Sequence, residues 1–504
     1  MNHDHTQAPV LEALARYRQS GALSFCPPGH KQGRGADPEV RRVLGDAVFR
    51  DDLLASGALD DRRGRGRVLE RAEALMADAV HATHTFFTTC GSSLSVKSAM
   101  LAVAGPHQKL LIGRDAHKSV VSGLILSGVR PVWVDPQWDA ERHLAHPPSP
   151  AAFEAAFEKH PDARGALVVS PTPYGTCADL RGIAEVCHRR SRPLIVDEAW
   201  GAHLPFHPEL PAWAMDAGAD ICVTSIHKMG SGLEQGSVFH LQGDLVDPAV
   251  LRSRADLLGT TSPSVPVYAA LDGWRRQMVL HGHELLGNAL ELAAKVRTAV
   301  EGIPGLHVND RADLVGDGLA HDFDPLPVVV DVADLDTTGY VAADWLREHR
   351  HIAVHLADHR RINAQLTHAD DTSTAGALVS ALEDFAGHAG ELPGASSVAV
   401  PSPAELRMEQ SRLPRDAYFG PVEDVPVTEA AGRVSAEMLT PYPPGIPTAL
   451  PGERLTEPVL RYLTSGVAAG MQLPDATDPG LRTVRVLRED AAADAAGGRF
   501  PSSE

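Results

Sequence analysis

Short apolar runs alternate with amphipathic segments over residues 67–225 of this chain. Residues 67–80 carry apolar side chains at helical spacing and predict a helix, and the apolar run 85–90 that follows predicts a strand. Further strands are predicted at 109–113, 131–135, 165–170, 193–197 and 220–225. Because short buried strands that alternate with helices usually form a parallel sheet covered on both faces, we expect an α/β fold with a mostly parallel sheet.

The pattern changes twice in the second half of the chain. Residues 284–303 predict a long helix, and the strand, helix and strand expected after it are typical of a small α/β domain. Residues 387–403 are rich in Gly, Ser and Pro, as in a linker. The expected division is an N-terminal arm and loop at 1–35, a large domain at 36–284, a small α/β domain at 285–387, a linker at 388–403, an α+β C-terminal domain at 404–490 and a disordered tail at 491–504.

Charge and cysteine content exclude several classes of protein. The 46 basic and 65 acidic residues give a formal net charge of -19, which disfavours binding to nucleic acid or to an anionic membrane. The five cysteines include no CxxC pair, so we expect neither a disulfide framework nor a cysteine metal site. The N-terminus lacks the features of a signal peptide, and no apolar run is long enough to span a bilayer. A soluble cytoplasmic protein without a metal is expected.

Polar residues follow several of the predicted strands, where ligands bind in sheets of this kind. Gly91, Ser92 and Ser93 follow the run 85–90 and open a helix, so they can hold a phosphate or simply cap the helix. Asp197 ends an apolar run, and its carboxylate can point into a site or cap the next helix. Each observation alone leaves both interpretations open.

Lys228 stands in "TSIHK", just after the apolar run 220–225, and His117 stands in "RDAHKS" after 109–113. A loop lysine is usually a solvated surface residue, but one in a buried crevice can lose its proton and form an imine with an aldehyde. His117 can be a polar loop residue or lie against a flat ring. A phosphate cradle, a histidine ring, an acid and a lysine at strand ends are together the parts that hold pyridoxal phosphate. Their joint arrangement predicts this cofactor.

These motifs resemble the Orn/Lys/Arg decarboxylase family of fold type I pyridoxal-phosphate enzymes, in its shorter form without a wing domain. The similar segments cover almost the whole chain except its two ends. They are "PPGHKQGRG", "FFTTCGSS", "RDAHKSVVSGLILSG", "VVSPTPYGTCADL", "LIVDEAWGAHLPFHPELP", "TSIHK", "LLGTTSPS" and "PYPPGIPTALPGE". The resemblance implies a fold type I, transferase-like large domain.

The resemblance also implies roles for individual residues. Lys228 would be the Schiff-base lysine, Asp197 the partner of the pyridine nitrogen and His117 the group stacked on the ring, with His227 a second candidate for proton transfer. The residues expected at the cofactor are Gly91, Ser92, Ser93, His117, Asp197, Ala199, Ser225, His227 and Lys228, with Thr261 and Ser262 reaching the phosphate of a neighbouring subunit. Glu453 and Trp200 are expected at the substrate, Glu453 as the partner of its cationic side chain.

The reaction that the resemblance implies is decarboxylation of a basic amino acid to an amine and carbon dioxide. Arginine, giving agmatine, is favoured, and lysine and ornithine remain open. The implied assembly is a homo-oligomer, a dimer or a tetramer, with active sites at the subunit interface. The alternatives are an aminotransferase or another α-carbon lyase with the same cofactor, and a non-catalytic regulatory homologue. The chain departs from the family pattern at Cys90, Leu94, Trp200 and Glu234, which bears on substrate choice more than on cofactor binding.

Overall fold

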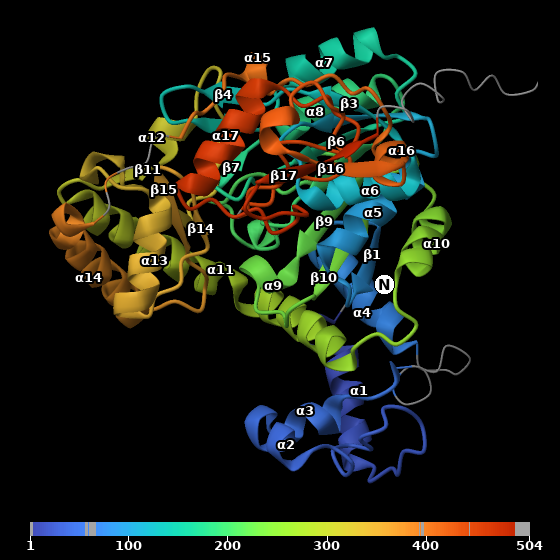
Figure 1. Ribbon diagram of the computed structural model, residues 1–504. Helices are drawn as coiled ribbons and strands as arrows, with labels where there is room; N and C mark the ends of the chain where they lie inside the picture. Colours follow the sequence, from blue (N-terminus) through green and yellow to red (C-terminus); the bar gives the residue numbers. More distant parts are fainter. Residues whose placement is uncertain are drawn as a thin grey trace, which may run out of the picture. The chain divides into compact units, whose positions relative to one another are not determined.

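The computed structural model describes residues 4–55, 59, 67–392, 394, 398–442 and 444–488 (Figure 1). The chain forms two compact units. The first unit consists of Met1–Val103, Arg164–Thr172 and Cys177–Ala289, and the second of Ala104–Ala163, Pro173–Thr176 and Leu290–Glu504. The predicted tail at 491–504 lies outside the described residues, as does part of the predicted linker, and the predicted domain limits stay predictions.

A run of five sheet strands forms the centre of the first unit. Their order is β1 (His84–Thr88), β10 (Ser237–Leu241), β9 (Ile221–Ser225), β8 (Leu194–Asp197) and β6 (Ala166–Val169). The last three strands are parallel to one another, and β10 runs antiparallel to both of its neighbours. Every residue of β6, β8 and β9 is buried, which explains why these strands read as continuous apolar runs.

Helices cover this sheet. Helix α5 (Gly91–Val103) packs against β9, β10 and α10 (Pro248–Leu258). The other elements that begin in this unit are α1 (Pro9–Gln19), α2 (Pro38–Leu44), α3 (Asp46–Asp51), α4 (Val68–Ala79), α8 (Leu180–His188), η2 (Leu204–Phe206), α9 (Ile226–Met229) and α11 (Val265–Glu301). The predicted helix 284–303 is only the C-terminal half of α11, which continues into the second unit.

The second unit holds the parallel strands β2 (Lys109–Gly113) and β3 (Arg130–Val134), connected by α6 (Lys118–Ser127). It also contains an antiparallel sheet in the order β11 (His307–Asn309), β13 (Pro327–Asp331), β15 (Arg361–Gln365) and β14 (Leu356–Ala357). Helices α13 (Gly339–Arg350) and α14 (Thr372–His388) pack against each other, and α13 contacts β15. Shorter elements that begin in this unit are β4 (Gln137–Asp139), β5 (Leu144–His146), α7 (Pro150–Lys159), β7 (Thr176–Cys177), α12 (Arg311–Leu314), β12 (Asp322–Phe323), η3 (Ala333–Leu335) and η4 (Ala389–Glu391).

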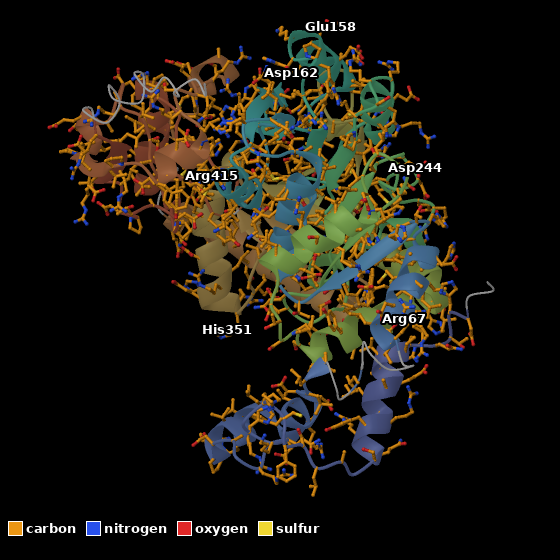
Figure 2. All side chains as sticks on the ribbon, turned by 90° about the vertical axis from the view of Figure 1, so that its right-hand side faces the viewer. Arg67, Glu158, Asp162, Asp244, His351 and Arg415 are labelled. Atoms are coloured by element: carbon orange, nitrogen blue, oxygen red, sulfur yellow. The ribbon has the colours of Figure 1, made fainter. Side chains whose placement is uncertain are left out.

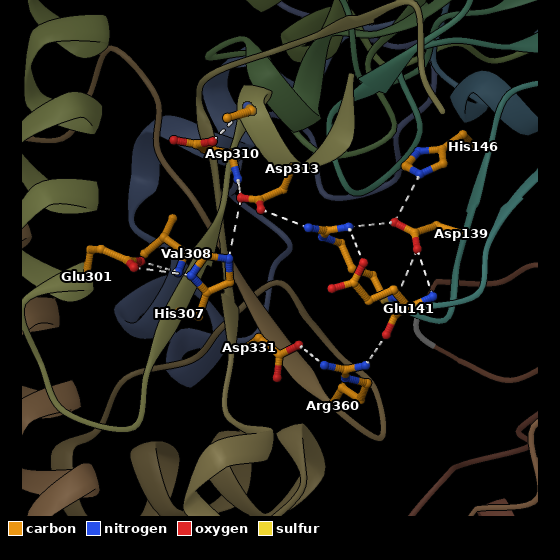
Figure 3. Close-up of polar contacts among 12 residues, drawn as sticks. Asp139, Glu141, His146, Glu301, His307, Val308, Asp310, Asp313, Asp331 and Arg360 are labelled. Carbon is orange, nitrogen blue, oxygen red and sulfur yellow. Dashed lines mark hydrogen bonds and ion pairs between the residues drawn. The ribbon is translucent and has the colours of Figure 1, made fainter. Parts of the chain in front are cut away.

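Ion pairs connect the end of β4 with α12, and the end of β13 with Arg360 (Figure 3). The guanidinium of Arg142 lies 3.2 Å from an oxygen of Asp139 and 2.9 Å from one of Asp313, and Arg360 lies 2.8 Å from Asp331. Because Arg142 holds two carboxylates from distant parts of the sequence, it fixes β4 to the neighbourhood of α12.

The C-terminal residues of the second unit form an apolar cluster of their own. Strand β16 (Val422–Pro426) pairs antiparallel with β17 (Thr483–Leu487), and α17 (Glu457–Ala468) buries Val459 and Leu463 in the cluster. The remaining elements here are α15 (Pro403–Leu406), α16 (Pro414–Tyr418) and η5 (Val427–Glu429).

The charged surface is separate from these cores. Figure 2 shows side chains such as Glu158, Asp162 and Asp244 pointing away from the ribbon, and all three are exposed. None of the helices in the described part of the chain has the length and apolar character that a membrane span requires.

The predicted α/β class with a mostly parallel sheet is confirmed. The predicted strands at 109–113 and 220–225 match β2 and β9 to within one residue. Strand β10, whose five residues are all buried, was not predicted from the sequence.

Candidate active site

Strand β8 ends in a buried acid. Its apolar residues lie between β6 and β9, and the register pairs Asp197 with Val223 of β9. Asp197 is 3% exposed, and its carboxylate accepts a hydrogen bond from the backbone N–H of Ala199 at 3.3 Å. Burial raises the pKa of this carboxyl, while the positive charge of Lys228 lowers it. Ala199 belongs to a turn, so Asp197 does not cap a helix. The charges of Asp197 and Lys228 act on each other.

Lys228 lies on α9, the single helical turn that directly follows β9. It is half-buried, and its Nζ lies 4.1 Å from the centroid of the Trp200 indole ring. Burial lowers the pKa of this amine to about 8, although the negative charges of Asp197 and Glu234 act in the opposite direction. Lys228 is therefore not a solvated surface lysine, and its amine loses a proton more readily than an exposed one.

The turn that carries Trp200 is fixed by the residues on either side of it. The buried Glu198 carboxyl accepts hydrogen bonds from the Cys222 thiol at 3.1 Å and from the backbone N–H of Ala214 at 3.3 Å, and burial raises its pKa well above the ordinary value. A Cβ atom at Gly201 would lie only 2.4 Å from Cγ of Glu198. A side chain at position 201 would therefore displace the turn and with it the indole ring.

Two serine hydroxyls meet at the N-terminus of α5. The hydroxyl of Ser225, at the end of β9, donates to Oγ of Ser92 at 2.6 Å, and the helix begins at Gly91 with a φ of 73°. Ser93, the next residue of this turn, is exposed. Hydroxyls and free N–H groups at a helix N-terminus suit a phosphate. Leu94 is buried in the core and adds no hydroxyl to this site.

His227 precedes the lysine on α9. Its Nδ1 lies 3.1 Å from the backbone carbonyl oxygen of Gly236, which can only accept, so Nδ1 carries the proton. The same arrangement makes Nε2 the ring atom that can accept a proton.

Thr261 and Ser262 lie in the loop between α10 and α11. Both are exposed, and Ser262 donates its backbone N–H to Oγ1 of Thr260 at 3.1 Å. Thr261 and the half-buried Cys90 line a cavity of about 400 Å³ in the first unit. The predicted contact with a neighbouring subunit stays a prediction.

His117 and Glu453 belong to the second unit. His117 caps α6, and its Nδ1 accepts the backbone N–H of Ser119 at 3.2 Å. Glu453 is 1% exposed, and its carboxylate accepts the Leu450 N–H at 2.9 Å and lies 3.3 Å from Nη2 of Arg114. Burial raises the pKa of Glu453, while Arg114 lowers it. Arg114 was not among the residues predicted from the sequence. The sequence feature that could have pointed to it is its position directly after the predicted strand 109–113.

The chain belongs to the Orn/Lys/Arg decarboxylase family. The model of the Orn/Lys/Arg decarboxylase major domain matches residues 8–315, and that of the C-terminal domain matches residues 398–478. The arginine decarboxylase of Halalkalibacterium halodurans is 36% identical over 487 residues, which is 96% of this chain and 99% of the relative. The arginine decarboxylase of Bacillus subtilis is 35% identical over 489 residues, again 96% and 99% of the two chains. The resemblance seen in the sequence is confirmed.

Solved structures show the same fold. The structure of the Escherichia coli constitutive lysine decarboxylase has a TM-score of 0.78 at 22% identity and covers 96% of this chain and 82% of its own. Lysine decarboxylase A from Pseudomonas aeruginosa has a TM-score of 0.79 at 22% identity, with 95% and 80% covered. The serine palmitoyltransferase of Sphingomonas wittichii has a TM-score of 0.53 at 16% identity, with 72% and 86% covered.

Proposed function

We propose that the protein decarboxylates a basic amino acid, arginine before lysine or ornithine, with pyridoxal phosphate as its cofactor. The observation that carries the proposal is the amine of Lys228, whose pKa burial lowers to about 8 beside the buried acid Asp197. The arginine decarboxylases that are 35–36% identical to the chain over almost its full length support arginine as the first choice.

The residues present fit this cofactor. The N-terminus of α5, with the hydroxyls of Ser92 and Ser225, suits its phosphate, and Lys228 suits its aldehyde. A carboxylate accepts several hydrogen bonds, so the bond from Ala199 leaves Asp197 able to accept one more from the ring nitrogen. We assign the ring face to His117. When bound, the cofactor takes up the electrons that carbon dioxide leaves on the α-carbon.

The chain itself supplies charge and proton transfer. With the cofactor bound, the negative charge of Asp197 would favour the protonated form of the ring nitrogen. Lys228 can donate a proton to the α-carbon because a pKa of about 8 allows it to be protonated at neutral pH and to release the proton easily. His227 is the second candidate for this step, provided that Nε2 has first taken up the proton that it then donates. Trp200 shields one side of the amine from water.

Glu234 is the carboxylate that we assign to the distal cation of the substrate. It is exposed, and its charge raises the pKa of Lys228. The two residues that follow it are held in place, because Gly91 N–H donates to Gln235 O at 2.9 Å and Ile226 N–H donates to Gly236 O at 3.0 Å. Glu453, predicted for this role, lies 3.3 Å from Nη2 of Arg114, and its contact with the substrate stays a prediction.

We further propose that the enzyme is a cytoplasmic homo-oligomer, a dimer or a tetramer, in which each active site is completed by a neighbouring subunit. The exposure of Thr261 and Ser262 supports this arrangement, since a loop that reaches another subunit must be accessible in the single chain. No nucleic acid or membrane is required.

Product analysis tests the proposal. The purified protein, supplied with pyridoxal phosphate and arginine but no keto acid, should form agmatine and carbon dioxide in equal amounts. Formation of a 2-keto acid that depends on an added amino acceptor would indicate an aminotransferase instead. A non-catalytic homologue would form neither product.

A further inference from the structure

We propose that Arg114 is a positioning residue that holds loop 444–448 of the C-terminal region against the imidazole of His117. The loop belongs to the motif "PYPPGIPTALPGE". The proposed reaction assigns no role to this loop. The proposal rests on the proposed function in one respect, because the orientation of His117 matters to catalysis only if its ring lies against the cofactor.

Arg114 contacts the loop with both ends of its guanidinium. Its backbone N–H donates to the carbonyl of Val134 at 2.9 Å, which fixes the residue at the ends of β2 and β3. Nη1 donates to the carbonyl of Pro447 at 2.8 Å, and Nη2 donates to the carbonyl of Thr448 at 2.9 Å. A planar fork with two donors in fixed geometry can hold two successive carbonyls, which a lysine cannot reproduce.

Glu453 holds the guanidinium in this place. Its two carboxylate oxygens lie 3.3 and 3.4 Å from Nη2 of Arg114, and one of them also accepts the N–H of Leu450. The carboxylate is almost fully buried, and both of its oxygens face this guanidinium. Glu453 therefore acts on the loop through Arg114.

At the other end of the loop, Gly445 abuts the ring of His117. The backbone N–H of Lys118 donates to the carbonyl of Gly445 at 2.9 Å, which ties the loop to the start of α6. A Cβ atom at Gly445 would lie 3.0 Å from Nε2 of His117, and the φ of 86° also favours glycine. Ser119 binds Nδ1 from the opposite edge of the ring. The imidazole is thus held between Ser119 and the loop, and its orientation depends on the loop staying in place.

Three variants and one matched control test this role. Gly445→Ala adds a methyl group against the ring, Arg114→Met removes the hydrogen bonds to Pro447 and Thr448, and Arg114→Lys keeps the charge without the fork. Gly432→Ala is the control, because Gly432 has a similar φ of 81° but nothing lies within 4 Å of an added Cβ. The control carries the same backbone strain without the contact to His117.

The first measurement uses the full-length, cofactor-free protein labelled with ¹³C at histidine Cε1. The His117 signal is identified by its loss in His117→Gln. It should move in Gly445→Ala, Arg114→Met and Arg114→Lys, and keep its position in Gly432→Ala. The thermal unfolding transition of Arg114→Met shows whether this variant is folded. An unchanged His117 signal in Gly445→Ala, or in folded Arg114→Met, would overturn the proposal.

The second measurement is the Kd for pyridoxal phosphate. A ring displaced by about 1 Å should weaken its contact enough to raise Kd at least about tenfold in Gly445→Ala and Arg114→Met. Glu453→Gln should raise it in the same direction, and Gly432→Ala should leave it unchanged. Unchanged cofactor affinity with a displaced His117 signal would overturn the positioning role. If the wild-type protein decarboxylates no amino acid, the proposed function fails, whereas the signal of His117 still decides whether the loop orients it.

Discussion

The amine nitrogen of Lys228 lies 4.1 Å from the centre of the Trp200 indole ring. The face of an indole ring favours an ammonium over a neutral amine, whereas burial favours the neutral amine. Burial lowers the pKa of Lys228 to about 8, against the opposing charges of Asp197 and Glu234. The amine is therefore mostly protonated at neutral pH and half-protonated near pH 8.

Trp200→Leu should lower the pKa of Lys228 further, by roughly 0.5–1 unit, because the ring no longer stabilises the ammonium. The rate at which an amine-selective reagent modifies Lys228 in the cofactor-free protein, measured against pH, gives this pKa. Trp200→Phe keeps an aromatic face and should lower the pKa of Lys228 less than Trp200→Leu does. A pKa that rises in Trp200→Leu would contradict this prediction and show that the indole acts mainly by keeping water away from the amine.

Glu234→Gln should raise KM for arginine about three- to tenfold and change kcat little, because an exposed charge-assisted contact with the distal group contributes roughly 1 kcal/mol. Steady-state kinetics at low and high salt measure KM for both proteins. The difference in KM between the wild type and Glu234→Gln should be smaller at high salt. Glu209→Gln, which removes another exposed carboxylate of the first unit, is the control. A drop in kcat at unchanged KM would assign Glu234 to the chemistry instead.

Asp115→Asn should change how stability depends on pH. Burial raises the pKa of Asp115 to about 7, so the folded state binds its proton more tightly than the unfolded state does. The stability that this group contributes is fully present below about pH 4 and is lost as the pH rises through 7, by at most about 4 kcal/mol.

Denaturant unfolding of Asp115→Asn at pH 5 and pH 8 checks this prediction. The free energy of unfolding of the variant should exceed that of the wild type at pH 8, and the difference should be smaller at pH 5. Glu158→Gln, at an exposed position of the same unit labelled in Figure 2, should show no such dependence. A variant that is less stable than the wild type at pH 8 would mean that the charged carboxylate is stabilised by its surroundings.

Thr261→Glu should inactivate the enzyme, because its negative charge would repel the cofactor phosphate of the neighbouring subunit. Co-expression of Thr261→Glu with Lys228→Ala should restore up to about a quarter of the wild-type activity, since half of the dimers are mixed and each has one intact site. Thr298→Glu, exposed on α11, is the control for the added charge. Absence of activity in isolated mixed dimers would place Thr261 and Lys228 in the same subunit's site.

The apolar pattern predicted β6, β8 and β9 because these parallel strands are buried along their whole length. Strand β10 was not predicted, although its residues are also buried. Its sequence "SVFHL" contains His240, which interrupts the apolar pattern. The histidine is accommodated by a contact with the hydroxyl of Thr85 at 2.9 Å, on the strand paired with β10. Such a contact depends on strand order and cannot be read from a local pattern.

The same limit applies to the candidate site. The order of motifs predicted Asp197 and Lys228, whose charges act on each other in the structure. Motif order could not predict that Glu453 would be engaged by Arg114, because the two residues are 339 positions apart and each forms its contacts in the folded chain.

In the proposed reaction, Lys228 carries the decarboxylation of a basic amino acid. Carbon dioxide release from arginine, lysine and ornithine, measured in parallel for the wild type and Lys228→Ala at saturating pyridoxal phosphate, tests it most directly. The wild type should release carbon dioxide fastest from arginine, and Lys228→Ala should lose at least about a thousandfold in rate, because both cofactor attachment and proton transfer depend on this amine. Equal release by the two proteins would contradict the claim.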